Sequence, residues 1–324
     1  MLDSKKKIAK KMAGVQRNVL LANYTTYKIG GPAKYFLIAK TKEELLKAIK
    51  IAKEFNLPIF ILGGGSNILI SDKGFSGLVI KIENSDIKIE GRRVFVGAGA
   101  SLIKLSYLLA DNGLSGLEWV AGVPGTIGGA IHGNAHAFNS EIGDVVESVE
   151  IIDAKTLKIK KLIKKQCKFS SKDSVFKKNK NLIIISAVLT FRKKDKKEVK
   201  NKIRKFLDYR RQKHPTKFPS AGSVFINPKI VIKDKKTLEK FPEIKEYNKK
   251  GYLPAGYLIE RVGLAGKKIG NAKISDKHAN FIINLGGAKA KDVLALIELA
   301  RKKVKKFFGI NLEPEIQLIG FDKI

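Results

Sequence analysis

Two glycine-rich segments have the residue types of backbone cradles for a bound ligand. Gly63-Gly64-Gly65-Ser66-Asn67 follows a predicted strand, and Gly122-Val123-Pro124-Gly125-Thr126-Ile127-Gly128-Gly129-Ala130 lies about 60 residues later. Glycines let a backbone approach a ligand closely and turn its N–H groups toward an anion. Neither the spacing G-x-G-x-x-G of a Rossmann dinucleotide site nor that of a P-loop occurs. The first segment alone is also compatible with a tight turn, but the pair suits a ligand with a diphosphate and a long body.

Three polar side chains have a chemical use only if the fold brings partners to them. Ser223 lies in a small-residue turn without the G-x-S-x-G pattern of a nucleophilic serine, and the histidine spacing identifies no general base. By itself, Ser223 is more typical of a turn residue. Glu313 and Glu315 flank Pro314, and either one is equally compatible with a solvated carboxylate.

No metal site is predicted. His132 and His136 have i, i+4 spacing, but the intervening Gly133-Asn134 argues against a helix, and no acidic third ligand is evident. Cys167 is the only cysteine, which excludes an internal disulfide and a zinc cluster built on thiolates.

The charge allows two interpretations. Sixty-four Lys and Arg against thirty Asp and Glu give a formal net charge of +34, which suggests a nucleic-acid partner. However, only nine of the 64 are arginines, the residue type that reads base edges and pairs phosphates bidentately. Residues 57–150 carry six basic and ten acidic residues. The lysine runs are therefore interpreted as solvated faces, whose field would also steer small polyanions into a cleft.

Length and patterning indicate a folded protein of two or three domains. The chain has 324 residues, of which 44% are hydrophobic, enough for real cores. No apolar run approaches ~18–20 residues, which predicts no membrane insertion. No apolar core follows the charged N-terminus, so we expect no secretory signal and a cytoplasmic location.

Helices, strands and turns alternate in a way typical of an α+β protein with two lobes. A strand is expected over Tyr24–Pro32. Thr41-Lys42-Glu43-Glu44 forms a capping box ahead of an apolar helical repeat that ends before Pro58. The other predicted helices are 101–113, 196–211, 255–263 and 290–308, the last ending at Gly309. The other predicted strands are 59–62, 78–82, 93–97, 145–153, 157–163, 182–192, 220–225, 279–284 and one after Pro314.

Seven segments, in this order, resemble the UDP-N-acetylenolpyruvoylglucosamine reductase family, flavin enzymes of peptidoglycan precursor synthesis. They are Tyr24–Pro32, Ile61–Asp72, Leu117–Ala130, Phe169–Phe176, Ser220–Pro228, Leu258–Phe281 and Leu312–Gly320. The resemblance implies an α+β fold with a two-part FAD-binding lobe of the vanillyl-alcohol-oxidase (PCMH) type and a smaller α+β substrate-binding lobe. We place these at 21–205 and 206–324, after a basic lead-in at 1–20. An inserted tyrosine-bearing loop found in one branch is absent, which indicates the shorter type.

The resemblance also implies a reaction and its cofactors. NADPH reduces non-covalently bound FAD, and UDP-N-acetylglucosamine enolpyruvate then takes its place. Hydride passes from flavin N5 to C3 of the enolpyruvyl group, and protonation at C2 gives UDP-N-acetylmuramate. An enolate forms beside a carboxylate in that step, so positive charge or acidic hydrogen-bond donors must be aimed there in advance.

Residue roles follow from the same resemblance. Ser223 is the expected proton donor, and Glu315, in its protonated form, stabilises the enolate with Lys172. The residues expected to bind the cofactor are Gly63, Gly64, Gly65, Ser66, Asn67, Gly122, Pro124, Gly125, Thr126, Gly128, Gly129 and Asn134. Those expected to grip the UDP portion of the substrate are Arg210, Asn227 and His278.

The chain departs from the family pattern in two places. Lys172 stands where the Tyr-Arg-Asp-Ser pattern has arginine, which keeps the positive charge but loses the bidentate fork. His132-Gly133-Asn134-Ala135-His136 replaces the usual residues around the asparagine, so we expect altered packing near FAD there.

The expected partners are NADPH and a UDP-sugar, with no nucleic acid and a monomeric protein. Two alternatives stay open at this stage. One is another flavin oxidoreductase of the same superfamily, acting on a different alcohol or sugar. The other is a basic nucleic-acid-binding protein that retains an old enzyme fold.

Overall fold

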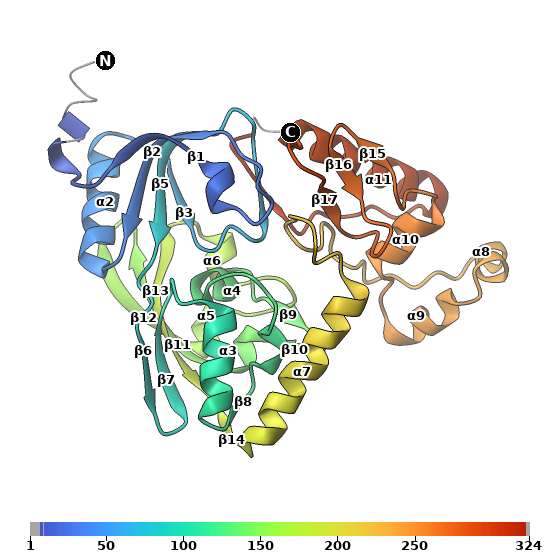
Figure 1. Ribbon diagram of the computed structural model, residues 1–324, viewed down its shortest axis with the longest axis horizontal. Coiled ribbons are helices and arrows are strands. Elements are labelled where there is room, and N and C mark those ends of the chain that lie inside the picture. Colours follow the sequence, from blue (N-terminus) through green and yellow to red (C-terminus); the bar gives the residue numbers. More distant parts are fainter. Residues whose placement is uncertain (1–6, 9, 322–324) are drawn as a thin grey trace. The chain divides into compact units, whose positions relative to one another are not determined.

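The chain forms two compact units in the computed structural model, which describes residues 7–8 and 10–321 (Figure 1). Unit 1 comprises Met1–Leu20, Pro32–Gly65 and Phe75–Gln212, and unit 2 comprises Leu21–Gly31, Ser66–Gly74 and Lys213–Ile324. Residues 1–6 and 9 of the basic lead-in, and 322–324 of the second lobe, lie outside the described residues.

The units differ in detail from the lobes that we placed on the sequence. The boundary expected after residue 205 falls inside helix α7 (Lys196–Lys213), and the division comes after Gln212. Two short segments from the N-terminal half belong to unit 2, because Tyr27, Ile29 and Leu69 are buried in its hydrophobic core.

The first sheet of unit 1 has four strands in the order β1-β2-β5-β3 (Figure 1). Their bounds are β1 Gln16–Leu20, β2 Pro32–Ala39, β5 Phe75–Ile82 and β3 Ile59–Leu62. β1 is antiparallel to β2, whereas β2 and β3 both run parallel to β5. No strand was expected in the basic lead-in, where β1 lies. β1 is an edge strand, and its polar residues are largely exposed.

Helix α2 (Lys42–Glu54) packs on this sheet and begins at the predicted capping box. The N–H of Glu44 donates to Thr41 Oγ1 at 3.2 Å, and the N–H of Thr41 donates back to the Glu44 carboxylate at 3.4 Å. The apolar side chains at helical spacing are buried, namely Leu45, Ala48, Ile49, Ile51 and Ala52. The local sequence therefore dictates both the start of α2 and its buried face.

The second sheet of unit 1 is fully antiparallel, in the order β12-β11-β13-β7-β6. Its strands are β12 Lys158–Ile163, β11 Val146–Asp153, β13 Leu182–Thr190, β7 Arg93–Gly97 and β6 Ile87–Glu90. The strands predicted at 93–97, 145–153, 157–163 and 182–192 are confirmed within two residues. Alternating apolar residues such as Val149 and Ile151 are completely buried, which is the pattern that predicted them.

Three further helices of unit 1 begin at polar caps. α3 (Leu102–Asp111) begins after Ser101, α4 (Ile127–His132) after Thr126 and α6 (Val175–Lys178) after Ser174. The remaining elements are η2 Glu118–Val120, η3 Ile142–Asp144, α5 Lys164–Cys167, β8 Leu114–Ser115, β9 His136–Ala137, β10 Ser140–Glu141 and β14 Arg192–Lys193.

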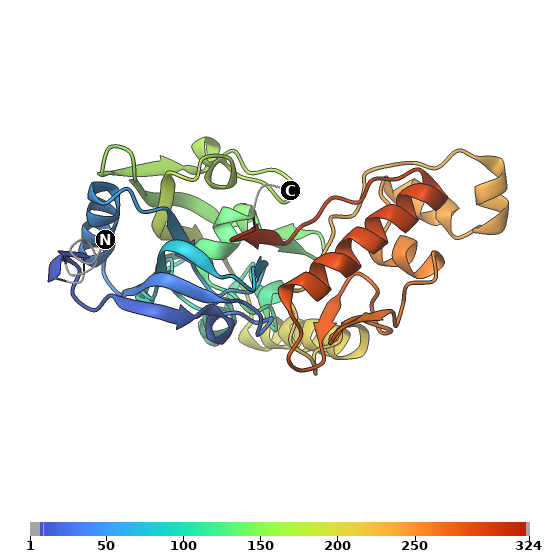
Figure 2. The same cartoon turned by 90° about the horizontal axis from the view of Figure 1, so that it is seen from above.

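Unit 2 is built around a three-stranded antiparallel sheet and one long helix. β15 (Lys268–Ile269), β16 (Ala272–Ile274) and β17 (Ile282–Asn284) pair in that order, and α11 (Ala290–Phe308) packs on the first two (Figure 2). α11 ends at Gly309 as predicted, and this residue has the left-handed conformation, with a φ of 70°. The other elements are η1 Leu21–Tyr24, β4 Ile68–Ile70, α8 Lys235–Lys240, α9 Ile244–Lys250, α10 Ala255–Arg261 and β18 Gln317–Ile319, which is parallel to β4.

The strand expected over Tyr24–Pro32 is wrong. The chain curls there, because Lys28 has a φ of 56°, Gly30 a φ of 144°, and Thr25 Oγ1 donates to the carbonyl oxygens of Ala22 and Ile29. Tyr27 and Ile29, at alternate positions, are buried in the core of unit 2. This segment therefore has the burial pattern of a strand without pairing in a sheet. Residues 220–225 likewise form no regular strand and make only isolated bridges.

Candidate functional site

Within unit 1, the glycines of the first segment, Gly63 to Gly65, lie against the second glycine-rich segment. A Cβ on Gly64 would come within 2.7 Å of the Cα of Gly125, and a Cβ on Gly63 within 2.7 Å of Thr126 Oγ1. Gly125 itself has a φ of 145°, a conformation that side chains rarely adopt. Segments about 60 residues apart in the sequence are thus packed directly on each other.

Within the second segment the glycines have different surroundings. A Cβ on Gly128 would meet that of Ala98 at 2.8 Å, and the N–H of Gly128 donates to the Ala98 carbonyl oxygen at 2.8 Å. Gly128 is therefore needed for packing against the end of β7. Gly129 and Pro124 are exposed, and a Cβ on Gly129 would have only Thr126 Oγ1 nearby, at 3.5 Å. Pro124 and Gly129 therefore have more surface available for a ligand than Gly128 does.

Arg210 supports this glycine segment from inside unit 1. Its Nε donates to the carbonyl oxygen of Ala121 at 3.1 Å, and its Nη2 to that of Trp119 at 2.9 Å. Its side chain lies against Gly122, where a Cβ would be 3.2 Å from Arg210 Cδ. Burial lowers the pKa of the Arg210 guanidinium from its usual value. The structure thus gives Arg210 internal partners that the sequence did not indicate.

Asn134, expected to contact the cofactor, is completely buried. Its Nδ2 donates to the carbonyl oxygen of Ser170 at 2.8 Å, and its Oδ1 accepts from the N–H of Gly143 at 3.1 Å. The side chain therefore joins two loop segments and offers no surface to a ligand in this arrangement.

Lys172 lies in a tight turn closed by two hydrogen bonds. The N–H groups of Ser170 and Asp173 each donate to the other residue's carbonyl oxygen at 3.0 Å. Lys172 has a φ of 58°, and its carbonyl oxygen accepts from Lys177 Nζ at 2.9 Å. Sequence reasoning missed Lys177, because no feature separates it from the other lysines of this stretch. Asp173 pairs with Lys178, and that hydrogen bond lowers the pKa of the Asp173 carboxyl.

Ser223 and Glu315 are brought together in unit 2 by backbone pairing. Ser223 forms a bridge with Phe281, and the N–H of Glu315 donates to the carbonyl oxygen of Val224, next to Ser223, at 2.7 Å. Asn67, from the first glycine-rich segment, donates through Nδ2 to the carbonyl oxygen of Glu315 at 3.3 Å. Four segments far apart in the sequence, those of Asn67, Ser223, Phe281 and Glu315, thus meet here.

The sequence did not distinguish Glu313 from Glu315 as the functional carboxyl group, but their side-chain exposure differs. Glu313 is exposed, whereas Glu315 is half-buried. Of the two side chains, that of Glu315 is therefore the less accessible to solvent.

Two other predicted substrate ligands also have internal partners in unit 2. Asn227 Oδ1 accepts from the N–H of Ala255 at 2.9 Å, at the start of α10. His278 Nδ1 accepts from the N–H of Asn280 at 3.3 Å, and its ring packs edge-on against His214. Burial lowers the pKa of His278, which keeps the ring neutral near pH 7. Its proton is then on Nε2, because Nδ1 is the acceptor.

His132 and His136 occupy different elements, as Gly133-Asn134 predicted. His132 ends α4 and His136 begins β9. Within the described ranges, 7–8 and 10–321, no group of three or more His, Cys, Asp or Glu side chains is arranged to hold a metal ion. The Cys167 thiol is buried, and desolvation raises its pKa to about 11.

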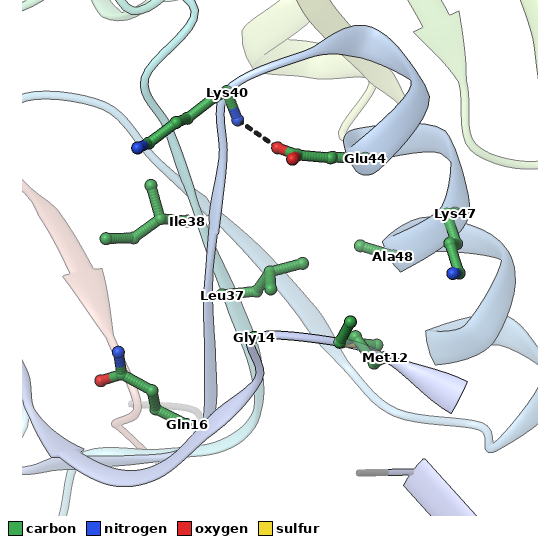
Figure 3. A pocket seen from close by; sticks show the side chains of 10 residues that line it. Met12, Gly14, Gln16, Leu37, Ile38, Lys40, Glu44, Lys47 and Ala48 are labelled. Atoms are coloured by element: carbon green, nitrogen blue, oxygen red, sulfur yellow. Dashed lines mark hydrogen bonds between the residues drawn. The ribbon is translucent and has the colours of Figure 1, made fainter. Parts of the chain in front are cut away.

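A hollow of about 310 Å³ lies elsewhere in unit 1, beside β2 and α2 (Figure 3). Its lining includes Met12, Gln16, Leu37 and Lys40. The Glu44 carboxylate at its rim accepts from the N–H of Lys40 at 2.7 Å and is engaged in the cap of α2. None of the predicted site residues lines this hollow.

Comparisons with known proteins agree with the two-part architecture. Residues 33–158 match the FAD binding domain family, and 214–319 match the C-terminal domain of UDP-N-acetylenolpyruvoylglucosamine reductase. Reductases of that name from Anoxybacillus flavithermus and Caldicellulosiruptor bescii are 39% and 40% identical to this chain. They align over 94% and 93% of this chain, and over 94% and 89% of their own lengths.

A solved structure gives the same result. The UDP-N-acetylenolpyruvylglucosamine reductase from Thermus caldophilus matches with a TM-score of 0.75 and 31% identity, covering 94% of this chain and 98% of that one. The predicted fold class, α+β with a two-part FAD-binding lobe and a second α+β lobe, is confirmed. No helix in the described part of the chain is long and apolar enough to cross a membrane.

The identity over nearly the full length of both chains establishes the relationship that the seven sequence segments suggested. This protein belongs to the UDP-N-acetylenolpyruvoylglucosamine reductase family, whose members are FAD-dependent oxidoreductases.

Proposed function

We propose that this chain reduces UDP-N-acetylglucosamine enolpyruvate to UDP-N-acetylmuramate, with FAD as bound cofactor and NADPH as hydride donor, in cytoplasmic peptidoglycan precursor synthesis. The observation that carries this proposal is the backbone pairing of Glu315 with Val224, which brings Glu315 beside Ser223. A hydroxyl and a half-buried carboxyl at neighbouring positions are the two groups that protonation and enolate stabilisation need.

The two glycine-rich segments suit a dinucleotide cofactor, because glycine lets a backbone approach a ligand closely. The close approach of Gly64 to Gly125 leaves no room for a Cβ, and Gly129 and Pro124 are exposed beside it. We assign FAD binding to Gly63, Gly64, Gly65, Ser66, Asn67, Gly122, Pro124, Gly125, Thr126, Gly128 and Gly129. When bound, the flavin supplies a hydride to C3 of the enolpyruvyl group. Non-covalent binding agrees with the burial of Cys167, the only cysteine.

The residues of the chain complete the reduction. Hydride addition at C3 leaves an electron pair at C2, delocalised into the neighbouring carboxylate as an enolate. Ser223 donates its hydroxyl proton to C2, forming the C–H bond, and regains a proton from solvent. A serine hydroxyl is a weak acid, so it is competent only against such a strongly basic carbon. Lys172 contributes fixed positive charge, and the Glu315 carboxyl group a hydrogen bond, to the enolate oxygens.

Each proposed UDP-binding side chain still has a donor for the ligand. Arg210 uses Nε and Nη2 internally, so Nη1 is the nitrogen that it offers. With Oδ1 engaged, Asn227 offers Nδ2, and His278 offers Nε2–H. Neutral donors of this kind suit the uracil and ribose, and Arg210 suits a phosphate oxygen.

The test is direct. The purified protein should be yellow, with a flavin spectrum, and should oxidise NADPH much faster when the enolpyruvyl substrate is present. Acid precipitation should leave the colour in the supernatant, because the flavin is not tethered. A colourless protein that cannot be reconstituted with FAD, and whose affinity for duplex DNA falls steeply with salt, would instead support the nucleic-acid alternative. Sedimentation of the same sample tests the predicted monomer.

A further inference from the structure

Lys172 has a backbone conformation that its residue type disfavours. It is the third residue of the four-residue turn Ser170–Asp173, and its φ is 58°. A positive φ at that turn position favours Gly or Asn, which tolerate the left-handed region. A turn with only a structural role would be more stable with one of those residues. Lysine is therefore held in this conformation at some cost in backbone stability.

The turn is held from outside by two side chains. Asn134, completely buried, donates through Nδ2 to the carbonyl oxygen of Ser170, the first residue of the turn. Lys177, from the short helix α6, donates through Nζ to the carbonyl oxygen of Lys172 itself. Both bonds reach backbone oxygens of the turn, so they fix the peptide planes from which the Lys172 side chain starts.

A third contact fixes the segment that follows. Ser174 is completely buried, and its Oγ donates to the carbonyl oxygen of His132 at 2.6 Å while capping α6 through the N–H of Lys177. Asn134 and Ser174 thereby join the same two stretches, 132–134 and 170–174. The turn has hydrogen-bonded supports before, at and after Lys172.

We infer that Asn134 and Lys177 are positioning residues, which hold the Ser170–Asp173 turn so that Lys172 presents its ammonium group in one place. This inference rests on the proposed function, in which Lys172 stabilises the enolate. A single ammonium group lacks the bidentate geometry of the arginine usual in the family, so its effect depends on being held at one distance from the developing charge.

Lys177→Met is the most informative variant, because Lys177 lies near the surface and the substitution keeps the length of its side chain. We expect reduction of the flavin by NADPH to be unchanged, and its reoxidation by the enolpyruvyl substrate to slow about 10- to 100-fold. Lys177→Arg should restore most of the rate. The matched control is Lys180→Met, which removes a nearby exposed lysine that has no bond to the turn and should leave both half-reactions unchanged.

A double-mutant cycle separates positioning from a direct effect of charge. If Lys177 acts through Lys172, Lys177→Met should have no effect on reoxidation in a Lys172→Ala background. An equal slowing in both backgrounds, or an equal slowing by Lys180→Met, would overturn the inference. Asn134→Ala should behave like Lys177→Met in this cycle, provided that it folds.

Hydrogen exchange gives a readout that does not depend on catalysis. The N–H groups of Ser170 and Asp173 close the turn, so Lys177→Met should speed their exchange, whereas Lys180→Met should not. Unchanged exchange in Lys177→Met would overturn the positioning role. If exchange changes as expected but the wild-type protein does not reduce the enolpyruvyl substrate, the proposed function fails and the structural support of the turn stands.

Discussion

The backbone N–H of Glu315 donates to the carbonyl oxygen of Val224 at 2.7 Å, although 91 residues separate them in the chain. A second bond, from the N–H of Ile226 to the carbonyl oxygen of Glu313 at 2.9 Å, continues the pairing. This register places the proposed proton donor, Ser223, and the proposed acid, Glu315, on neighbouring segments of unit 2. Both are held by main-chain bonds, so substituting either side chain should leave their support intact.

Replacing Ser223 with alanine should slow the protonation of C2 without disturbing cofactor binding. We expect flavin reduction by NADPH to be unchanged and flavin reoxidation by the enolpyruvyl substrate to fall about 10²- to 10⁴-fold, the range for loss of a general acid. Stopped-flow absorbance measures both half-reactions. Ser223→Cys should retain part of the activity, because a thiol also donates a proton. Full activity in the alanine variant would remove Ser223 from the mechanism.

Replacing Lys172 with alanine should remove the fixed positive charge at the enolate. Loss of one such electrostatic contact lowers turnover about 10²- to 10³-fold. Lys172→Arg keeps the charge and should stay within about tenfold of wild type. Hydride transfer from reduced flavin to substrate is the step to measure. If alanine leaves that step unchanged, Lys172 has no role in it.

Replacing Gly64 with alanine should separate the two glycine segments. The new Cβ would lie 2.7 Å from the Cα of Gly125, and backbone must shift to relieve the contact. We expect a loss of about 1–3 kcal/mol in stability and much weaker FAD binding, measured by thermal unfolding and flavin fluorescence. Gly133→Ala is the matched control, because the nearest atom to its Cβ, Gly129 O, is 3.8 Å away. Equal effects of the two substitutions would contradict a specific contact at Gly64.

Acid should destabilise the protein partly through His278. Burial lowers the folded-state pKa of this ring below its ordinary value near 6.5. As the pH falls, the ring is therefore protonated in the unfolded state before it is protonated in the folded state. The stability that the neutral ring contributes above pH 6.5 is lost as the pH falls from there through the folded-state pKa. Chemical unfolding between pH 7.5 and 5 measures the slope. His278→Gln should have a shallower slope, and an unchanged slope would assign the dependence to other groups such as His132, whose pKa burial also lowers.

Much of the fold was predictable because its signals are local. The capping box at Thr41 and Glu44 specifies the start of α2, the period of buried apolar residues specifies its inner face, and Gly309 ends α11. Each involves residues within a few positions of one another, so the sequence contains the whole interaction. The glycine-rich segments were also recognisable, because few other uses require so many glycines in so short a stretch.

The long-range arrangement was not predictable from those signals. Tyr24–Pro32 has the composition of a strand, yet it curls into unit 2, because burial of Tyr27 and Ile29 there outweighs sheet pairing. Asn134 was assigned to the cofactor on resemblance, whereas its amide joins Ser170 to Gly143. A side chain's partner across 36 residues depends on where both loops are placed.

By itself, the sequence determined which residue types are available for the chemistry and which helices and strands form around them. Only the tertiary structure decided which of those residues meet: Gly64 with Gly125, Glu315 with Val224, and Asn134 with the turn that carries Lys172. The physical reason is that local structure depends on backbone conformation and nearby side chains. Contacts between distant segments depend instead on the packing of whole cores and on sheet register, which no short stretch of sequence contains.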